Sequence, residues 1–448
     1  MSHGIRSDRS ETIVAAATPG GSGGVAIVRL SGAQATTIGE RIAGPLPPPR
    51  QAAQRRFAAR DGEAIDLGLV LRFPAPASFT GEDVVELHCH GGPVIVQALI
   101  ATAVEHGARR ARAGEFSERA FLNDKLDLAQ AEAIADLVAS GTEQAAKAAL
   151  RSLTGAFSAA SAELERQLVE LRVHVEAAID FPDDDVDFLA DEALSQRLES
   201  CRRTYVALLD ATGRGRLLRD GYQIVIAGRP NAGKSSLLNH LSGEDTAIVT
   251  DIAGTTRDVL RERIDVDGLA VELVDTAGLR DDPDVIEAEG IRRARRALEQ
   301  ADAALWIEDS TTFERYRSGD ELPESLPVIV VRNKIDLVGE AAGSRDGVLF
   351  LSARTGEGID ALKAAIRELA GYRASTEGAF TARQRHIEAL ERSRQHFDAG
   401  VRRLQAERAG ELLAEELRLA LDALGEVTGK VTSDELLGRI FSSFCIGK

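Results

Sequence analysis

The sequence predicts a multidomain protein in which an α+β domain comes first and an α/β domain is inserted into a helical domain. Three features predict this organisation. Short apolar strands alternate with two helical patterns before residue 113, a strand, glycine-rich loop and helix follow residue 221, and amphipathic helical patterns lie on both sides of that segment. We expect boundaries at 1–122, 123–217, 218–374 and 375–448, with the second and fourth segments forming one domain.

The N-terminal segment has the pattern of a compact α+β domain. Apolar runs predict strands, and apolar side chains at helical spacing predict helices. Residues 20–24 read Gly-Gly-Ser-Gly-Gly, but a β-branched run follows them, so a turn that enters a strand is favoured over a phosphate loop. The predicted strands are 12–15, 25–30, 67–73 and 84–88, and the predicted helices are 33–42 and 93–106.

Two histidines at the end of this segment raise the alternative of a metal site. His88 and His90 lie on one face of a predicted strand, where both imidazoles are able to bind one ion. A protein metal site normally needs three or four ligands, and the sequence offers no further ligand nearby. Ordinary hydrogen-bonded histidines are therefore favoured.

Two stretches predict a helical domain that is split in the sequence. Apolar side chains recur at helical spacing both before and after the α/β segment. A single bundle interrupted by an inserted domain buries both stripes with fewer exposed faces than two separate bundles. The stripe before the insertion consists of Leu164, Leu168, Leu171 and Val175. After the insertion one face carries Ile387, Leu390, Phe397, Val401 and Leu404, and another carries Leu413, Leu417, Ala420, Leu421 and Leu424.

The composition limits the class of protein. A chain of 448 residues with 44% hydrophobic residues is able to form several globular cores. Its net charge of −17 argues against non-specific nucleic-acid binding, so any RNA contact must be local or shared with a partner. Three widely spaced cysteines indicate a reducing compartment, and no apolar leader or membrane span is expected. We therefore expect a cytoplasmic protein.

The segment from Gly228 to Ser236 is a phosphate-binding loop in its usual setting. A β-branched strand precedes it and an apolar helix start follows it. The glycines allow successive backbone N–H groups and the helix N-terminus to point at one anion. Lys234 adds a positive charge near the outer phosphates, and the Ser235 hydroxyl suits Mg²⁺. The loop predicts a nucleotide-binding domain.

Further motifs select the nucleotide and the metal. Asp275-Thr-Ala-Gly278 places an acid at the end of a second strand, and Thr256 offers a second hydroxyl for Mg²⁺. In Asn333-Lys-Ile-Asp336 the final carboxylate is able to accept hydrogen bonds from the ring N–H and the amine of guanine. Adenine lacks that pairing, so the nucleotide is predicted to be GTP. Ser352-Ala-Arg354 supplies a backbone N–H for the guanine carbonyl.

The residue that would orient the attacking water in Ras-like enzymes is absent. Leu279 occupies the position of the usual glutamine and has no hydrogen-bonding group. Glu287 is our candidate for polarising the water, although it is one of several acids in 281–289. Positive charge in the transition state comes either from Arg257 or from a monovalent cation held by Asn231 and backbone carbonyls of residues 250–255.

The whole pattern resembles the MnmE family, also called TrmE, of tRNA-modification GTPases within the TrmE-Era-EngA-like group. The resemblance rests on the GTP-site segments 228–236, 250–258 and 275–280, on the stretch Phe116 to Gln130 and on the terminal Cys445-Ile-Gly-Lys448. It implies a tetrahydrofolate-binding and dimerising N-terminal domain, a discontinuous all-α domain and an inserted P-loop, Ras-like G domain. It also implies a homodimer.

The resemblance implies a GTPase that acts with MnmG, an FAD- and NADH-dependent partner, in a heterotetramer or larger complex. The pair adds a carboxymethylaminomethyl or aminomethyl group to C5 of the wobble uridine of certain tRNAs, and a 5-formyl or methylene tetrahydrofolate supplies the carbon. We expect tRNA affinity to reside largely in this complex. The alternative is a GTP switch in ribosome assembly or signalling, but no basic RNA-binding appendage is visible in the sequence.

The resemblance also implies roles for individual residues. Glu287 becomes the catalytic glutamate, Ser235 and Thr256 bind Mg²⁺, and potassium binds Asn231 and the main-chain oxygens of three residues of the 250–255 loop, Thr250, Ile252 and Thr255. Folate contacts fall on Arg29, Glu86, Lys125 and Lys448, and Cys445 lies near the chemistry, where it either reacts or packs. The expected GTP contacts are Asn231, Ala232, Gly233, Lys234, Ser235, Ser236, Thr250, Asp251, Ile252, Ala253, Gly254, Thr255, Thr256, Asp275, Thr276, Ala277, Gly278, Asn333, Lys334, Asp336, Ser352, Ala353 and Arg354.

Overall fold

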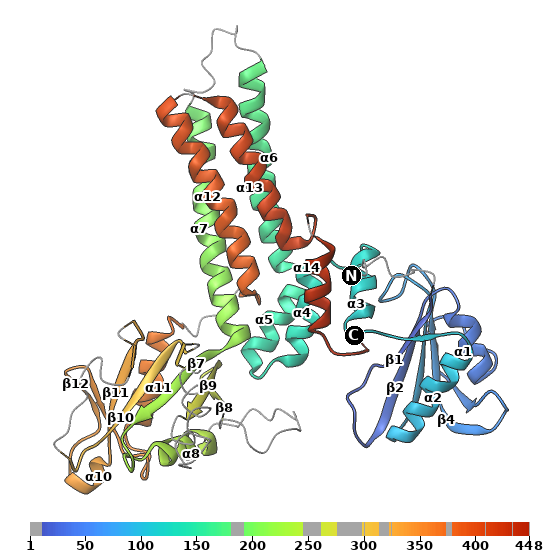
Figure 1. The fold of residues 1–448 in the computed structure, drawn as a ribbon, viewed down its shortest axis with the longest axis horizontal. Helices are drawn as coiled ribbons and strands as arrows, with labels where there is room; N and C mark the ends of the chain where they lie inside the picture. Colours follow the sequence, from blue (N-terminus) through green and yellow to red (C-terminus); the bar gives the residue numbers. More distant parts are fainter. Residues whose placement is uncertain are drawn as a thin grey trace, which may run out of the picture. The chain divides into compact units, whose positions relative to one another are not determined.

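The computed structural model divides the chain into two compact units, which are described separately below (Figure 1). One unit comprises residues 1–135, 152–205 and 388–448, and the other comprises residues 136–151 and 206–387. This division into two units does not test the four predicted domain boundaries, which stay predictions. The structure describes residues 11–180, 192–244, 261–275, 298–299, 301–312, 322–323, 325–372, 379–407, 409–431 and 433–447.

The N-terminal part of the first unit is a mixed sheet with two helices on one face. Among the described residues, six strands lie in the order β3-β4-β5-β2-β1-β6, and only β1 and β6 run parallel. The strands are β1 (Ile13–Ala16), β2 (Gly23–Ser31), β3 (Ala53–Ala58), β4 (Ala64–Phe73), β5 (Val84–Gly91) and β6 (Arg109–Arg110), and the helices are α1 (Ala35–Ala43) and α2 (Pro93–Glu105).

The two faces of this sheet bury different residues. Val14 packs with apolar side chains of α1 and α2, whereas Ile13 and Ala15 face the other way, because successive side chains of a strand alternate. Phe116 of α3 (Glu115–Leu122) packs against Ile13 and Ala15 on that second face. Helix α3 is thus attached to the sheet on the side opposite α1 and α2.

The predicted strands and helices of this region are confirmed, but β3 and the two-residue strand β6 were not predicted. Strand β3 was not expected, because its sequence Ala-Gln-Arg-Arg-Phe-Ala has only one large apolar side chain. Its pairing with β4 along the whole strand and the complete burial of Phe57 stabilise it. The expected turn at residues 20–24 does lead into β2.

Helices from both sides of the inserted sheet form one bundle. The predicted stripe of Leu164, Leu168, Leu171 and Val175 is fully buried, and α6 packs on α13. Tyr205 of α7 donates to or accepts from Ser393 of α12 at 2.7 Å within the bundle. The helices with these contacts are α6 (Ala156–Asp180), α7 (Glu192–Asp220), α12 (Gln384–Glu407) and α13 (Gly410–Thr428). Further helices outside the two sheets are α4 (Leu128–Ala139), α5 (Glu143–Leu153) and α14 (Asp434–Ser442).

The second unit contains a mostly parallel sheet. In the described part of the chain, seven strands lie in the order β12-β13-β11-β10-β7-β9-β8, with β8 and β12 antiparallel to their neighbours. The strands are β7 (Tyr222–Gly228), β8 (Arg261–Val266), β9 (Leu269–Asp275), β10 (Ala303–Asp309), β11 (Val328–Asn333), β12 (Gly343–Arg345) and β13 (Val348–Phe350), and the helices are α8 (Lys234–Glu244), α10 (Ile335–Val338) and α11 (Ile359–Leu369).

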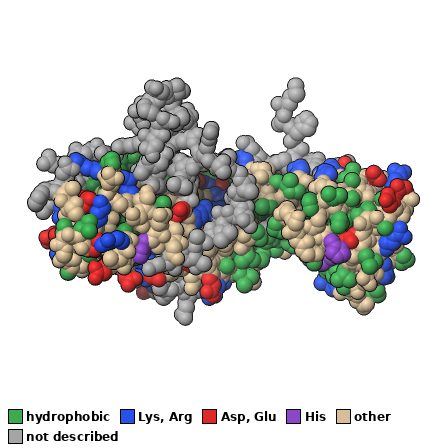
Figure 2. All heavy atoms as spheres, turned by 90° about the horizontal axis from the view of Figure 1, so that it is seen from below, with side chains coloured by type: hydrophobic (Ala, Val, Ile, Leu, Met, Phe, Trp, Pro, Cys, Tyr) green, Lys and Arg blue, Asp and Glu red, His purple; other side chains and the backbone are tan. Residues whose placement is uncertain are grey.

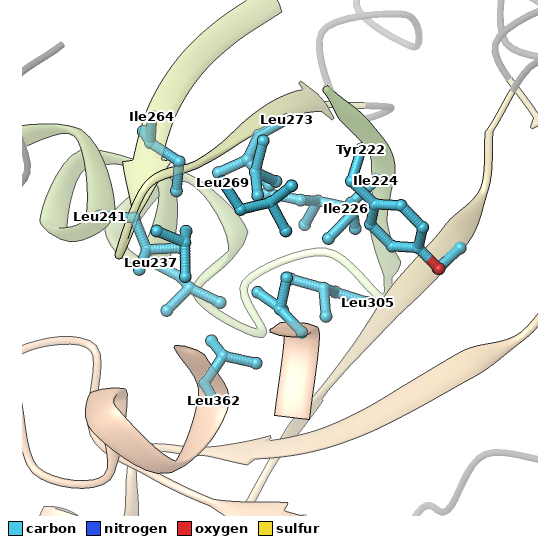
Figure 3. Packing of buried hydrophobic residues seen from close by; sticks show 14 of the residues in the cluster. Tyr222, Ile224, Ile226, Leu237, Leu241, Ile264, Leu269, Leu273, Leu305 and Leu362 are labelled. Carbon is cyan, nitrogen blue, oxygen red and sulfur yellow. The ribbon is translucent and has the colours of Figure 1, made fainter. Parts of the chain in front are cut away.

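One face of this sheet carries the largest apolar core of the unit (Figure 3). Ile224 and Ile226 of β7 lie beside Leu305 of β10, and Leu237 of α8 and Leu362 of α11 pack against them. Because β7, β10 and β11 are parallel neighbours, their carboxyl ends meet at one edge of the sheet. The loops after these strands are therefore brought together.

A buried carboxylate holds the chain where it enters and leaves the sheet. Asp136 of α4 accepts hydrogen bonds from Arg219 Nε at 2.9 Å and from Arg383 at 2.8 Å. Arg219 lies just before β7, and Arg383 lies just before α12.

Every helix in the described part of the chain is too short or too polar to span a lipid bilayer.

Candidate functional site: a nucleotide site and a second cavity

The phosphate loop connects β7 to α8 through three residues with left-handed backbones. Gly228, Asn231 and Gly233 have φ values of 134°, 62° and 96°. A Cβ at Gly228 would lie 2.3 Å from the carbonyl oxygen of Ile307 in β10, so the loop passes too close to the neighbouring strand for any side chain. The loop then enters α8, whose N-terminus presents backbone N–H groups to an anion.

Lys234 and Ser235 begin α8 in different environments. Lys234 is buried, and its Nζ donates hydrogen bonds to the carbonyl oxygens of Gly228 at 2.8 Å and Arg229 at 2.9 Å. The ammonium therefore lies inside the curve of the phosphate loop. Ser235 and Ser236 are exposed in the first turn of α8, where a hydroxyl is a suitable Mg²⁺ ligand.

Asn333 joins the phosphate loop to a segment more than a hundred residues away. Its Nδ2 donates to the carbonyl oxygen of Ala232 at 2.9 Å, and its Oδ1 accepts from the N–H of Ala353 at 2.9 Å. A Cβ at Gly233 would lie 2.2 Å from that Nδ2, so this glycine leaves room for the asparagine. The structure thus brings three of the predicted motifs into one buried connection.

Asp309 is a site residue that the sequence interpretation missed. It ends β10 in register with Asn333, and its Oδ2 accepts from Lys334 Nζ at 2.6 Å. The same ammonium donates to the carbonyl oxygen of Asn231 at 2.6 Å. Partial burial raises the pKa of Asp309, but hydrogen bonds from Lys334 and Thr311 outweigh it and hold the pKa below its ordinary value. The sequence signal that could have identified Asp309 was an acid at the end of the strand before the one that carries Asn333.

The predicted guanine-binding carboxylate is held from two sides. Asp336 Oδ1 accepts from the hydroxyl of buried Ser352 at 2.6 Å, and Arg354 forms an ion pair with Oδ2. Hydrogen bonding from Ser352 and the positive charge of Arg354 hold the pKa of Asp336 below its ordinary value. The carboxylate is therefore ionised at neutral pH, and 11% of its side-chain surface remains exposed to a ligand.

Part of the predicted site lies outside the described residues. Asp275 ends β9 in register with Ile226, and its side chain is not described. The expectations for Arg257, Leu279 and Glu287 also fall outside the described part of the chain. The same holds for Thr250, Asp251, Ile252, Ala253, Gly254, Thr255, Thr256, Thr276, Ala277 and Gly278.

A second site lies in the N-terminal part of the first unit. Three residues with predicted folate contacts, Arg29, Glu86 and Lys125, line one cavity of about 420 Å³. Arg29 and Glu86 are cross-strand partners on β2 and β5, and Arg29 Nε donates to Glu86 Oε1 at 2.9 Å. Arg50, Phe73, Ala77, Ser78, Phe79 and Val84 complete the lining.

The segment after α3 carries Lys125 to this cavity. Arg119 of α3 is buried and donates to Glu82 Oε2 at 2.8 Å and to the carbonyl oxygen of Glu11 at 2.9 Å. Asn123 Nδ2 donates to the carbonyl oxygen of Thr80 at 2.7 Å. These contacts attach α3 to the loop before β5, and Lys125 follows directly.

The C-terminal segment lies against the same sheet. Ile446 forms a β-bridge with Ala113, and a Cβ at Gly447 would lie 1.9 Å from the carbonyl oxygen of Ala16. Cys445 is exposed, and its carbonyl oxygen accepts from the N–H of Gly114 at 3.3 Å. Lys448 lies outside the described residues.

The two strand histidines pair with carboxylates. His88 Nε2 lies 3.2 Å from Glu86 Oε2, and His90 Nδ1 lies 2.8 Å from Asp66 Oδ1. No group of three or more histidine, cysteine, aspartate or glutamate side chains among the described residues is arranged to hold a metal ion. The favoured interpretation as hydrogen-bonded histidines agrees with these contacts.

Two family models together match most of the chain. A model of the MnmE helical domain matches residues 128–445, and a model described as the N-terminus of the GTP-binding protein TrmE matches residues 12–125.

Solved structures also match parts of the chain. The FeoB iron transporter G domain of T. maritima has 27% identity over 33% of this chain and 98% of that chain, with a TM-score of 0.24. The FeoB G domain of Methanococcus jannaschii has 26% identity over 34% and 98%, with a TM-score of 0.25. A GTP-binding protein of Sulfolobus solfataricus, in complex with GDP, has 17% identity over 47% and 67%, with a TM-score of 0.22.

Proposed function

The chain belongs to the MnmE (TrmE) family of GTP-binding proteins, and from this premise we propose that it is a potassium-dependent GTPase of tRNA modification. With MnmG it would add a carboxymethylaminomethyl or aminomethyl group to C5 of the wobble uridine of certain tRNAs. The observation that carries this proposal is that one chain holds both a GTP-type motif set joined through Asn333 and a cavity lined by Arg29, Glu86 and Lys125.

Guanine recognition is proposed for Asp336. Its ionised carboxylate would accept hydrogen bonds from the ring N–H and the exocyclic amine of guanine. The Ser352 hydroxyl, which donates to Asp336 Oδ1 at 2.6 Å, would hold the carboxylate in its orientation. A backbone N–H of residues 352–354 would meet the guanine carbonyl. A base without the two donors would leave the carboxylate unpaired, which disfavours its binding by several kcal/mol.

Phosphate binding is proposed for the loop before α8. The N–H groups of residues 231–236 would surround the phosphates, and Lys234 would exchange its two carbonyl partners for phosphate oxygens. The exposed hydroxyl of Ser235 fits a Mg²⁺ ligand, and Thr256 would supply a second one. When bound, the ion would neutralise charge on the outer phosphates.

Hydrolysis is proposed to depend on Glu287 and on a potassium ion. Leu279 is unable to orient water, so Glu287 would polarise it. Asn231 and the main-chain oxygens of Thr250, Ile252 and Thr255 would bind the ion. The ammonium of Lys334 on the Asn231 carbonyl, at 2.6 Å, supports this proposal because it fixes the backbone that carries the asparagine side chain. Two G domains would meet across a dimer during the reaction.

A tetrahydrofolate in its 5-formyl or methylene form is proposed as the ligand of the N-terminal cavity. Glu86 suits the amino-pyrimidine edge of a pterin, because a carboxylate accepts two adjacent N–H donors. Lys125 suits the carboxylates of the glutamate tail, and Lys448 and Cys445 are proposed to complete the site. The presence of Arg29, Glu86 and Lys125 in one cavity supports this assignment.

The proposed partners are a second copy of the chain, MnmG and tRNA, all in the cytoplasm. Val25, Leu67 and Leu69 are large apolar residues exposed on the N-terminal sheet, which supports contact with a second copy. Figure 2 shows acidic and basic side chains interspersed over one face of the described residues. The chain as a whole has a net charge of −17. We therefore assign most of the tRNA affinity to the complex with MnmG.

The modification role is tested by nucleoside analysis of cellular tRNA. Cells that lack the gene should contain wobble uridines without the C5 group, and the wild-type gene should restore it. Glu287→Ala should not restore it, whereas Glu289→Ala, which alters a neighbouring acid, should. Unchanged wobble uridines in cells without the gene would instead favour a GTP switch in ribosome assembly or signalling.

The potassium role is tested by GTP hydrolysis at equal ionic strength in KCl and NaCl. The wild-type rate should be higher in KCl, and Asn231→Ala should remove the difference between the two salts. Equal rates of the wild-type protein in both salts would contradict the role proposed for Asn231.

A further inference from the structure

The N-terminal cavity carries one more positive charge than its predicted folate residues supply. Three cations, Arg29, Arg50 and Lys125, line the cavity, and Glu86 is the acidic side chain among the lining residues. The lining therefore has a surplus of two positive charges, in a chain whose net charge is −17. Such a local surplus favours a ligand with two negative charges.

Arg29 is already engaged within the protein. Its Nε donates to Glu86 Oε1 at 2.9 Å, and its guanidinium carbon lies 5.8 Å from the ring centroids of both Phe79 and Phe116. The ion pair offsets its charge, and the two rings restrict its side chain. Arg29 therefore acts on a ligand mainly by orienting the carboxylate of Glu86.

Arg50 and Lys125 are placed differently. Arg50 donates to the carbonyl oxygen of Ala77 at 2.5 Å, and Lys125 donates to the carbonyl oxygen of Pro76 at 3.1 Å. These carbonyls belong to adjacent residues, so the two cations lie beside one short segment. Neither forms an ion pair with a carboxylate among the described residues. Both positive charges remain available to a ligand.

The backbone and one ring hold Arg50 in this position. Its φ of 62° lies in the left-handed region, which costs a residue other than glycine about 1 kcal/mol. Its N–H donates to the carbonyl oxygen of Arg72 at 2.9 Å, and its guanidinium carbon lies 5.8 Å from the ring centroid of Phe73. The guanidinium thus keeps further N–H donors free on a fixed support.

We propose that Arg50 is a further ligand-binding residue of this cavity and that, together with Lys125, it binds the two carboxylates of the glutamate tail of folate. This inference rests on the proposed folate function. Arg29 is then a positioning residue for Glu86, which binds the pterin edge at the opposite pole of the ligand. The cavity therefore binds a flat heterocycle with a dicarboxylate tail more tightly than the same heterocycle without that tail.

The experiment compares two ligands on the full-length protein by isothermal titration calorimetry. The ligands are 5-formyltetrahydrofolate and 5-formyltetrahydropteroate, which has the same ring system without the glutamate. Arg50→Gln should lower the affinity for the first about ten-fold and leave the affinity for the second unchanged, because one charged hydrogen bond is lost. Arg29→Gln should lower both affinities by the same factor.

Arg55→Gln is the matched control. Arg55 is exposed on β3 and also donates to main-chain carbonyls, those of Pro45 and Gln54, but it does not line the cavity. This variant should bind both ligands as the wild-type protein does. Equal affinities of Arg50→Gln and wild type for the folate, or an equal loss for both ligands, would overturn the inference. Failure of the wild-type protein to bind either ligand would instead remove the proposed folate function itself.

Discussion

The nucleotide site and the N-terminal cavity are assembled in different ways. The nucleotide site consists of short contiguous segments at the carboxyl ends of parallel strands, and many of its contacts involve the main chain, as with Asn333 and the carbonyl of Ala232. The cavity consists of side chains from separate elements. These side chains come from β2, β4, β5, the loops at Arg50 and Phe79, and the segment after α3.

The difference shows what each site depends on. A loop such as 228–233 keeps its shape through glycines and a following helix, so its spacing in the sequence reports its geometry. The cavity depends on the register between β2 and β5, because a shift of one residue would separate Arg29 from Glu86 and turn side chains to the other face. The first kind of site is local, and the second is a property of the folded sheet.

The largest effect that separates the two sites is expected for Asp336→Asn. The change replaces one acceptor oxygen by a donor, so GTP affinity should fall roughly 10³-fold. Xanthosine triphosphate, which carries a carbonyl in place of the guanine amine, should bind the variant better than GTP. Competition against a fluorescent GDP analogue measures both affinities. Folate affinity should not change.

Asp360→Asn is the control for that substitution, because it alters an exposed acid of the first turn of α11. It should leave GTP affinity within about two-fold of the wild-type value, since surface changes away from a site have small effects. A parallel loss of GTP and folate affinity in Asp336→Asn would mean that the two sites are not independent.

An intermediate effect is expected for Arg119→Gln, which disturbs the supports of the cavity alone. The variant leaves Glu82 without its buried partner, so local stability should fall by about 3 kcal/mol. Amides of β2 and β5 should then exchange hydrogen roughly a hundred-fold faster. Urea unfolding followed by the fluorescence of Trp306, the single tryptophan, should stay unchanged because Trp306 lies in β10.

Arg110→Gln is the matched control in the same domain, because Arg110 is exposed and donates to Gln97 at 3.1 Å. Its exchange rates should equal those of the wild-type protein. If Arg119→Gln shifted the Trp306 transition as strongly as the exchange of β2, the cavity and the nucleotide sheet would not be separate in stability.

The smallest effect is expected for Asp309→Asn, and it depends on pH. The pKa of Asp309 is lower in the folded protein than its ordinary value of 3.8, so the ionised carboxylate stabilises the folded state above that pH. At pH 7 the variant should be less stable by about 1 kcal/mol. The difference should shrink as the pH falls below 3.8 and through the lowered value. Urea unfolding followed by Trp306 fluorescence measures it.

Asp346→Asn provides the comparison, since Asp346 is exposed and its φ of 51° suits asparagine equally well. Its stability at pH 7 should lie within about 0.5 kcal/mol of the wild-type value, as for other exposed substitutions. A constant difference for Asp309→Asn between pH 7 and pH 3.5 would show that the ion pair with Lys334 does not stabilise the sheet edge.

Sequence reasoning predicted the local features well and the assembled ones poorly. The strand, loop and helix around Gly228 follow from residue types at short spacing, and so do the buried stripes of α6 and α13. Strand β3 was missed because pairing with β4 stabilises it, and its own residues have weak strand preference. Asp309 was missed because an acid at a strand end acquires its role only beside Lys334.

The sequence by itself determined the nucleotide motifs and the periodicity of the helices, because backbone geometry over a few residues depends on glycine positions and apolar spacing. Only the tertiary structure decided that Arg29 pairs with Glu86, that Arg50 and Lys125 adjoin neighbouring carbonyls, and that Asn333 joins the phosphate loop to Ala353. The physical reason is that these contacts connect residues far apart in the chain. Sheet register and burial bring these residues together, and the spacing of residues along the chain predicts neither.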